Sequence, residues 1–171
     1  MIDSPVPSEY CLKCDVCCRF PESHSPLAPY FTAEETDRAL RYRKGIRPFG
    51  EAVSGRIPLI PFPAGISSPG HEEGCICPYF NPADHHCLIY EVRPLDCQLY
   101  PYALMSDGNR IVLGVDTKCP FASDPTNDKR IREFSLKLIQ ILRSATYRET
   151  IGSNRELVGP KQDDVIPLHI L

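Results

Sequence analysis

The stretch Cys11-Leu12-Lys13-Cys14-Asp15-Val16-Cys17-Cys18 contains four of the nine cysteines of this chain. A spacer of two residues between cysteines lets the backbone turn so that successive sulfur atoms converge on one centre. Backbone N–H groups in such a turn can hydrogen-bond the thiolates. We therefore expect inorganic ions, more than regular secondary structure, to organise the fold around this stretch.

The spacing within the stretch indicates which centre it holds. Bacterial ferredoxins use the triple C-x2-C-x2-C spacing for three corners of a 4Fe-4S cluster, and a remote cysteine completes the set. Zinc sites more often use isolated C-x2-C pairs. The sequence therefore favours an iron-sulfur cluster, with zinc as the alternative. Side chains of neighbouring residues diverge on a helix or a strand, so we expect Cys17 and Cys18 to serve two different centres.

Five more cysteines follow the first stretch, and they are enough to complete two sites of four thiolates each. Eight ligands leave one cysteine over, for which we choose Cys75. The predicted ligands of the metal ions or clusters are Cys11, Cys14, Cys17, Cys18, Cys77, Cys87, Cys97 and Cys119. The spacing does not divide these eight between the two centres.

Charge gives a second reason to expect metal. Eight thiolates carry a charge of about -8, and two centres of charge +2 reduce this to about -4. Nearby arginines would compensate part of the remainder, and Arg19 and Arg93 are candidates because they lie close to cysteines in the sequence. His71, His85 and His86 lie between the cysteine segments and are possible ligands, although exposed loop histidines are the simpler interpretation.

The composition suggests a single domain that resides in a reducing compartment. A length of 171 residues is typical of one domain, here 1–171, and the net charge of -3 provides no basic surface for nucleic acid or an anionic membrane. The N-terminus has neither the charged nor the apolar region of a secretory signal, and no apolar run is long enough to span a bilayer. We expect a cytoplasmic protein, in which thiols stay reduced and bind metal. Disulfides are the less favoured alternative, and the odd cysteine count argues against complete pairing.

The rest of the chain predicts a small, loop-rich α+β fold with a short β-hairpin and two main helices. Eighteen prolines and no tryptophan indicate many turns. Thr32 and Glu35 form a capping box that begins a helix running to about Lys44, before Gly45. Residues 46–74 should be mostly loop, with short strands near Ile57–Ile60.

Two further elements are predicted beyond residue 100. Tyr102–Met105 and Arg110–Val115 flank Ser106–Asn109, a good signal for a hairpin. Apolar residues then recur at helical spacing, so we expect one amphipathic helix over about 125–147 that packs on the core. The final residues, Val165–Leu171, should dock on the body of the protein.

The ordered combination of cysteine motifs resembles the YkgJ-like cysteine cluster family, also described as the CxxCxxCC or zinc- or iron-chelating domain. The segments that carry the resemblance are Cys11–Cys18, Cys77–Phe80, Cys87–Pro94 and Cys97–Pro101. The resemblance covers about residues 10–120 and implies metal binding by the eight cysteines named above. One departure is Gln98, where the family often has arginine.

Three functions are compatible with these patterns. The first is an iron-sulfur protein of the 4Fe-4S type with a redox or accessory role, and the second is a zinc-binding structural or interaction module. The third is a cluster-assisted methyl transferase, implied by a distant resemblance to flagellin lysine N-methylases, although the chain has no recognisable S-adenosylmethionine-binding stretch. No side chain can be paired with a substrate, so the sequence assigns no catalytic residue and names metal ions or a cluster as the partner.

Overall fold

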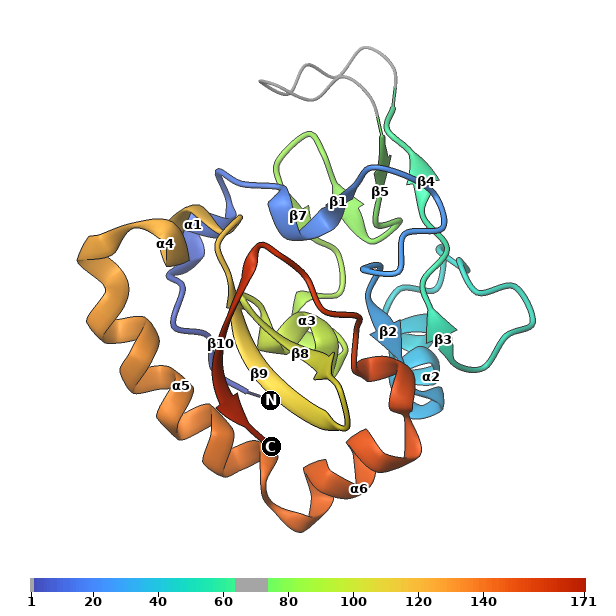
Figure 1. Cartoon of the computed structure of the whole chain (residues 1–171). Coiled ribbons are helices and arrows are strands. Elements are labelled where there is room, and N and C mark those ends of the chain that lie inside the picture. Colours follow the sequence, from blue (N-terminus) through green and yellow to red (C-terminus); the bar gives the residue numbers. More distant parts are fainter. Residues whose placement is uncertain (1, 64–73) are drawn as a thin grey trace. The chain divides into compact units, whose positions relative to one another are not determined.

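The computed structural model describes residues 2–63 and 74–171, which form two compact units (Figure 1). One unit is Ser8–Cys97, and the other joins Met1–Pro7 to Gln98–Leu171. The described residues form helices and small antiparallel sheets, so the predicted α+β class is confirmed. None of the helices in the described part of the chain is long and apolar enough to cross a membrane. The single domain over 1–171 stays a prediction.

The unit Ser8–Cys97 is built from short elements. Its helical segments are α1 (Ser8–Cys11), η1 (Val16–Cys18), α2 (Ala33–Tyr42), η2 (Tyr90–Val92) and the start of α3 (Leu95–Leu99). Its strands are β1 (Arg19–Phe20), β2 (Tyr30–Phe31), β3 (Gly55–Arg56), β4 (Ile60–Pro61), β5 (Cys75–Ile76), β6 (Phe80–Asn81) and β7 (His86–Cys87). They pair as a sheet in the order β1-β5-β4 and as two ribbons, β2-β3 and β6-β7. Ladders of two residues contribute few backbone hydrogen bonds, so side-chain packing must hold this unit together.

Helix α2 begins as the capping box predicts. The Thr32 hydroxyl accepts a hydrogen bond from the backbone N–H of Glu35, and the Glu35 carboxylate accepts one from the N–H of Thr32. The helix ends at Tyr42, two residues before the predicted Lys44. Short strands were predicted near Ile57–Ile60. The structure has β3 just before this range and β4 at its end.

The core of this unit contains cysteines as well as hydrocarbon side chains. Buried aromatic and aliphatic residues form one cluster, which includes the buried Cys77, and Cys18, Cys75 and Cys87 pack against it. The thiols therefore lie in a poorly hydrated region, where unpaired thiolates are disfavoured.

The other unit is centred on an antiparallel sheet in the order β10-β9-β8. Its strands are β8 (Tyr102–Asp107), β9 (Arg110–Asp116) and β10 (Val165–Ile170), and its helical segments are α4 (Pro120–Ser123), η3 (Pro125–Asn127), α5 (Asp128–Leu142), α6 (Ala145–Ser153) and η4 (Arg155–Leu157). The predicted hairpin is present, with Gly108 at φ 62° in its turn. The C-terminal segment docks as predicted, as the strand that pairs with β9.

The single helix expected over about 125–147 is wrong, because two helices occupy this region. Helix α5 ends at Leu142, and Ser144 has an extended backbone with φ -65° and ψ 155° at the start of α6. Serine is well suited to that position because it favours helix N-caps over helix interiors. The hydrophobic spacing runs through the break and therefore did not reveal it.

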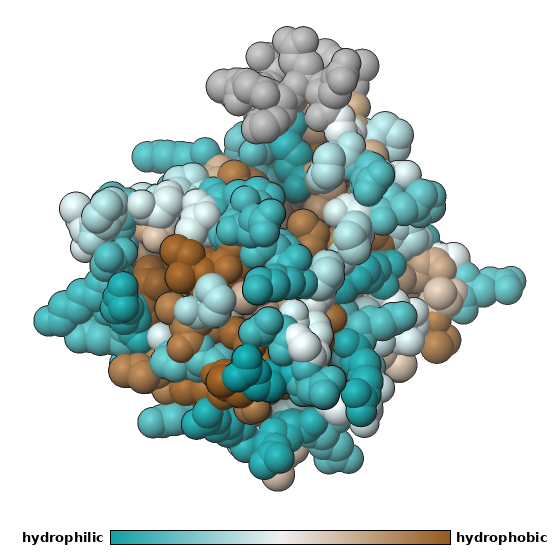
Figure 2. All heavy atoms as spheres, in the orientation of Figure 1, coloured by the Kyte–Doolittle hydropathy of each residue, from teal (hydrophilic) through white to brown (hydrophobic). Residues whose placement is uncertain are grey.

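Helix α5 packs along the sheet of its own unit, as Figure 1 shows beside β10. The Ser135 hydroxyl lies 2.9 Å from the His169 ring, and the Tyr102 hydroxyl donates to the Ile131 carbonyl at 2.6 Å. Figure 2 shows that apolar residues remain visible along α5 and β10, and Leu136 and Ile166 are among the exposed ones.

Candidate metal centre

Backbone pairing brings the first cysteine cluster to the second. Strand β1 begins directly after Cys18 and pairs with β5, which places Phe20 opposite Cys75. Beyond that ladder the backbone N–H of Cys77 donates to the carbonyl of Cys18 at 3.0 Å. Two segments almost sixty residues apart in sequence are thus held in a fixed register.

A second ribbon adds Cys87 to the group. The chain turns after Cys77, whose carbonyl accepts from the N–H of Phe80 at 2.9 Å, and β6 then pairs with β7 so that Phe80 lies opposite Cys87. The N–H of Leu88 donates to the carbonyl of Tyr79 at 2.8 Å and extends this pairing. The Cys77 and Cys87 backbones are therefore fixed relative to each other.

Cys17 and Cys18 do not diverge as their adjacency suggested. Both lie in the 3-10 segment η1, and their sulfur atoms are 3.8 Å apart and hydrogen-bonded. The hydrogen bond from Cys18 lowers the pKa of Cys17, and the same contact raises the pKa of Cys18 well above its usual value. Cys17 therefore loses its proton more readily than Cys18.

Five thiols influence one another electrostatically, although they come from four segments of the sequence. They are Cys17, Cys18, Cys77, Cys87 and Cys97. Burial raises the pKa of Cys77 to about 12, and it also raises the pKa of Cys87 and, strongly, of Cys97. Each of these three values is raised further by neighbouring cysteines, so this set of sulfurs needs a cation before it can lose its protons together.

Backbone N–H groups already face several of these sulfurs. The N–H of Val16 faces Cys14, that of Tyr79 faces Cys77, and that of Ile89 faces Cys87, in each case two residues after the cysteine. Each of these contacts lowers the pKa of its thiol. Donors at this spacing stabilise thiolates bound to metal, so the local backbone fits a metal-binding turn.

The two arginines named from the sequence have different surroundings. Arg19 is paired with Asp15 at 2.6 Å, both side chains are largely buried, and the guanidinium lies 4.2 Å from the centre of the Phe62 ring. Arg93 stacks over the Tyr90 ring at 4.1 Å, and its charge lowers the pKa of both Cys17 and Cys87. Arg93 thus acts on Cys17 and Cys87, and Arg19 contributes to the loop that carries Cys17 and Cys18.

The remaining predicted ligands differ in burial and in the unit to which they belong. Cys11 is exposed at the end of α1, and Cys14 is half-buried, with Cys17 among the groups that raise its pKa. Cys119 is buried in the unit Gln98–Leu171, away in sequence from the other cysteines. Cys75, the predicted spare, lies on β5. The eight-cysteine ligand set stays a prediction.

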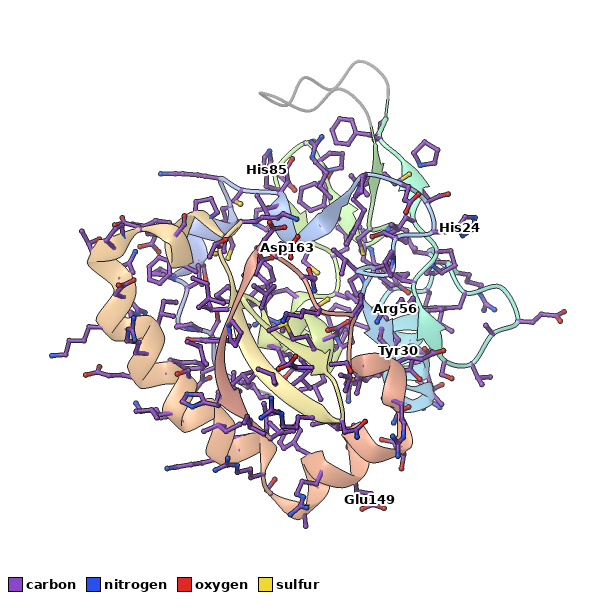
Figure 3. All side chains as sticks on the ribbon, viewed as in Figure 1. His24, Tyr30, Arg56, His85, Glu149 and Asp163 are labelled. Carbon is purple, nitrogen blue, oxygen red and sulfur yellow. The ribbon has the colours of Figure 1, made fainter. Side chains whose placement is uncertain are left out.

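Two of the three histidines named from the sequence, His85 and His86, lie on the β6-β7 ribbon or in its turn. His85 adopts φ 59° in the turn between β6 and β7 and is labelled in Figure 3. His86 is exposed and lies 3.2 Å from the Asp84 carboxylate. His71 lies outside the described residues.

Sequence reasoning missed Asp15. The signal was present, since Asp15 precedes Arg19 by four residues, a spacing at which opposite charges meet on one side of a helical turn. The segment around residues 12–15 was not expected to be helical, and it is irregular in the structure, so the spacing was not interpreted as an ion pair.

The donor set fits a thiophilic ion. Within residues 2–63 and 74–171, no three His, Cys, Asp or Glu side chains are already arranged to hold a metal ion. Sulfur donors, backbone N–H groups and a nearby guanidinium nevertheless match the needs of Zn2+, Fe2+ or an iron-sulfur cluster. Binding would therefore draw the sulfurs together as they lose their protons.

Comparison with known proteins agrees with this chemistry. Residues 10–120 match the model of the CxxCxxCC family, described as "Putative zinc- or iron-chelating domain". The chain is also similar to "Uncharacterized protein MJ0661" of Methanocaldococcus jannaschii, with 29% identity over 107 residues, which is 63% of this chain and 52% of that protein. It thus spans about half the length of this relative. No solved structure matches the chain.

Proposed function

Because the chain belongs to the CxxCxxCC family of zinc- or iron-chelating domains, a membership that supports metal binding, we propose that it carries a mononuclear tetrathiolate metal centre in the unit Ser8–Cys97. The four ligands are Cys17, Cys18, Cys77 and Cys97, which belong to the five mutually interacting thiols, and Cys87 is the fifth thiol beside them. The metal is zinc and its role is structural: it links three segments of a unit whose strands are only two residues long.

The distance between Cys17 and Cys18 carries this proposal. Two sulfur ligands of one tetrahedral ion, each bonded at about 2.3 Å, lie about 3.8 Å apart. The two sulfurs are separated by 3.8 Å. In a 4Fe-4S cluster each thiolate binds a different iron, so cysteine ligands lie farther apart than this. The distance between the two sulfurs therefore favours a single metal ion over a 4Fe-4S cluster.

Charge also favours an ion bound close to Arg93. Four thiolates and Zn2+ together carry a charge of about -2. The guanidinium of Arg93, held over Tyr90, offsets part of that charge at Cys17. A reducing compartment such as the cytoplasm suits this centre, because the ligands must remain thiols before they bind.

A 4Fe-4S cluster is the second candidate, and the spacing of Cys11, Cys14 and Cys17 favours it. Cys97 would be the remote fourth ligand. This candidate predicts a brown protein with absorbance near 400 nm and about four irons with four sulfides. A redox or accessory role would follow from it.

The test is elemental analysis of protein purified without oxygen, with two cysteine variants two residues apart. The unaltered chain should contain about one zinc and be colourless. Cys77→Ser should lose the metal, because it removes a ligand, whereas Cys75→Ser should retain it. About four irons with sulfide would replace the zinc proposal by the cluster, and absence of any stoichiometric metal would contradict both.

A further inference from the structure

Helix α3 carries Cys97, and its first residue is held by a side chain from another helix. The backbone N–H of Leu95 donates to Oε1 of Glu35 at 2.7 Å, in a buried hydrogen bond between residues sixty positions apart. Glu35 is 8% exposed, so this bond is shielded from water. An N–H at the start of a helix has no partner within that helix, and Glu35 supplies one.

The same carboxylate caps its own helix. Its other oxygen, Oε2, accepts from the N–H of Thr32 at 2.9 Å in the capping box of α2. Both oxygens are thus used, one for the start of α2 and one for the start of α3. A shift of Glu35 would move both helix starts.

A second carboxylate connects α3 to strand β2. Asp96, the neighbour of Cys97, accepts from the backbone N–H of Tyr30 at 2.9 Å and lies 3.8 Å from the Arg56 guanidinium. Tyr30 and Arg56 face each other on strands β2 and β3, as labelled in Figure 3. Arg56 in turn donates to the carbonyl of Ala28 at 2.6 Å. We call Glu35 and Asp96 together the carboxylate clasp.

We propose that the carboxylate clasp positions Cys97 for the metal centre, with Glu35 as its principal positioning residue. The inference rests on the proposed function in that it counts Cys97 as a ligand. Helix α3 has five residues, too few to hold its place by its own hydrogen bonds. The clasp fixes the two residues that directly precede Cys97, and therefore fixes the approach of its sulfur to the other thiols.

Glu35→Gln tests this with little change in shape. Glutamine has one acceptor oxygen and one amide group that only donates. It can keep the bond to Thr32, since glutamine also serves in capping boxes, but it then presents N–H groups to the N–H of Leu95. The matched control is Thr32→Ala, which weakens the cap of α2 and leaves both acceptor oxygens of Glu35 in place.

Two measurements decide the outcome. Zinc affinity, measured by competition with a chromophoric chelator, should fall about 10- to 100-fold in Glu35→Gln and less than about threefold in Thr32→Ala. Alkylation of Cys97 by iodoacetamide in the metal-free protein, followed by peptide mass spectrometry, should be several-fold faster in Glu35→Gln only. Glu35→Asp, which keeps the charge but is too short to reach both helices, should behave like Glu35→Gln.

Equal losses in Glu35→Gln and Thr32→Ala, in proportion to their stability, would overturn the positioning role. Unchanged alkylation of Cys97 in Glu35→Gln would do so as well. If the unaltered chain binds no metal, the proposed function fails, while the alkylation rates still decide whether the clasp holds Cys97.

Discussion

At the scale of single residues, Asp15 and Arg19 determine the loop on which Cys17 and Cys18 lie. Their side chains are 13% and 8% exposed. The Arg19 Nε donates a hydrogen bond to Asp15 Oδ2 at 2.8 Å, and the Arg19 Nη2 lies 2.6 Å from the same oxygen. Arg19 is also stacked on Phe62, so its position is fixed from two sides. Removing one partner of a largely buried pair leaves the other charge poorly solvated.

Asp15→Ala should therefore lower the free energy of unfolding by about 3 kcal/mol. Asp37→Ala is the matched control, because Asp37 and Arg41 form a pair at the same spacing of four residues but are 58% and 80% exposed. The control should cost at most about 0.5 kcal/mol. Urea titration of the metal-bound proteins measures both, and equal costs would mean that burial of the Asp15 pair is unimportant.

At the scale of elements, Gly114 sets how closely β10 approaches β9. A Cβ atom at this position would collide with the Val165 side chain, and it would lie 2.9 Å from the Ile166 carbonyl and 3.1 Å from the terminal methyl of Met105. Two of these contacts belong to β10. The pairing of the C-terminal strand therefore requires a residue without a side chain.

Gly114→Ala should destabilise the protein by about 2 kcal/mol or more, through overpacking at a paired strand. Gly152→Ala is the same substitution in α6, where a Cβ atom meets no neighbour within 4 Å. It should stabilise by about 0.5 kcal/mol, because alanine favours helix over glycine. Thermal unfolding of the two variants should show shifts of opposite sign, and a neutral Gly114→Ala would show that β10 can move away.

The predictable elements were those with a local signal. The capping box at Thr32 and the turn at Gly108 are each encoded within a few residues, and both were predicted. The break at Ser144 was not, because the apolar spacing continues across it. The 3.8 Å approach of Cys17 to Cys18 was also missed, since the alternation expected of strands and helices does not apply to a short 3-10 segment. The carboxylate clasp joins residues sixty or more positions apart, and no local pattern reveals it.

At the scale of the whole molecule, the two units differ in what holds each one together. The unit Gln98–Leu171 has a sheet with strands of six and seven residues and the fifteen-residue helix α5. The unit Ser8–Cys97 has strands of two residues each, and its longest helix has ten. A bound ion should therefore contribute far more to the stability of the unit Ser8–Cys97.

Removal of metal by a chelator should accordingly expose one unit and spare the other. Hydrogen exchange followed by mass spectrometry should show faster exchange for amides in Ser8–Cys97, including those of Cys77 and Phe80, whose N–H groups are hydrogen-bonded in the folded chain. Amides of β8 and β9 should change by less than about threefold. Uniform loss of protection along the chain would contradict this division of stability.

X-ray absorption at the metal edge tests the central claim most directly, on protein purified without oxygen. The account predicts zinc surrounded by about four sulfur atoms at about 2.3 Å, with no second metal nearby. A first shell made only of nitrogen and oxygen atoms, or a protein with no bound metal, would contradict it.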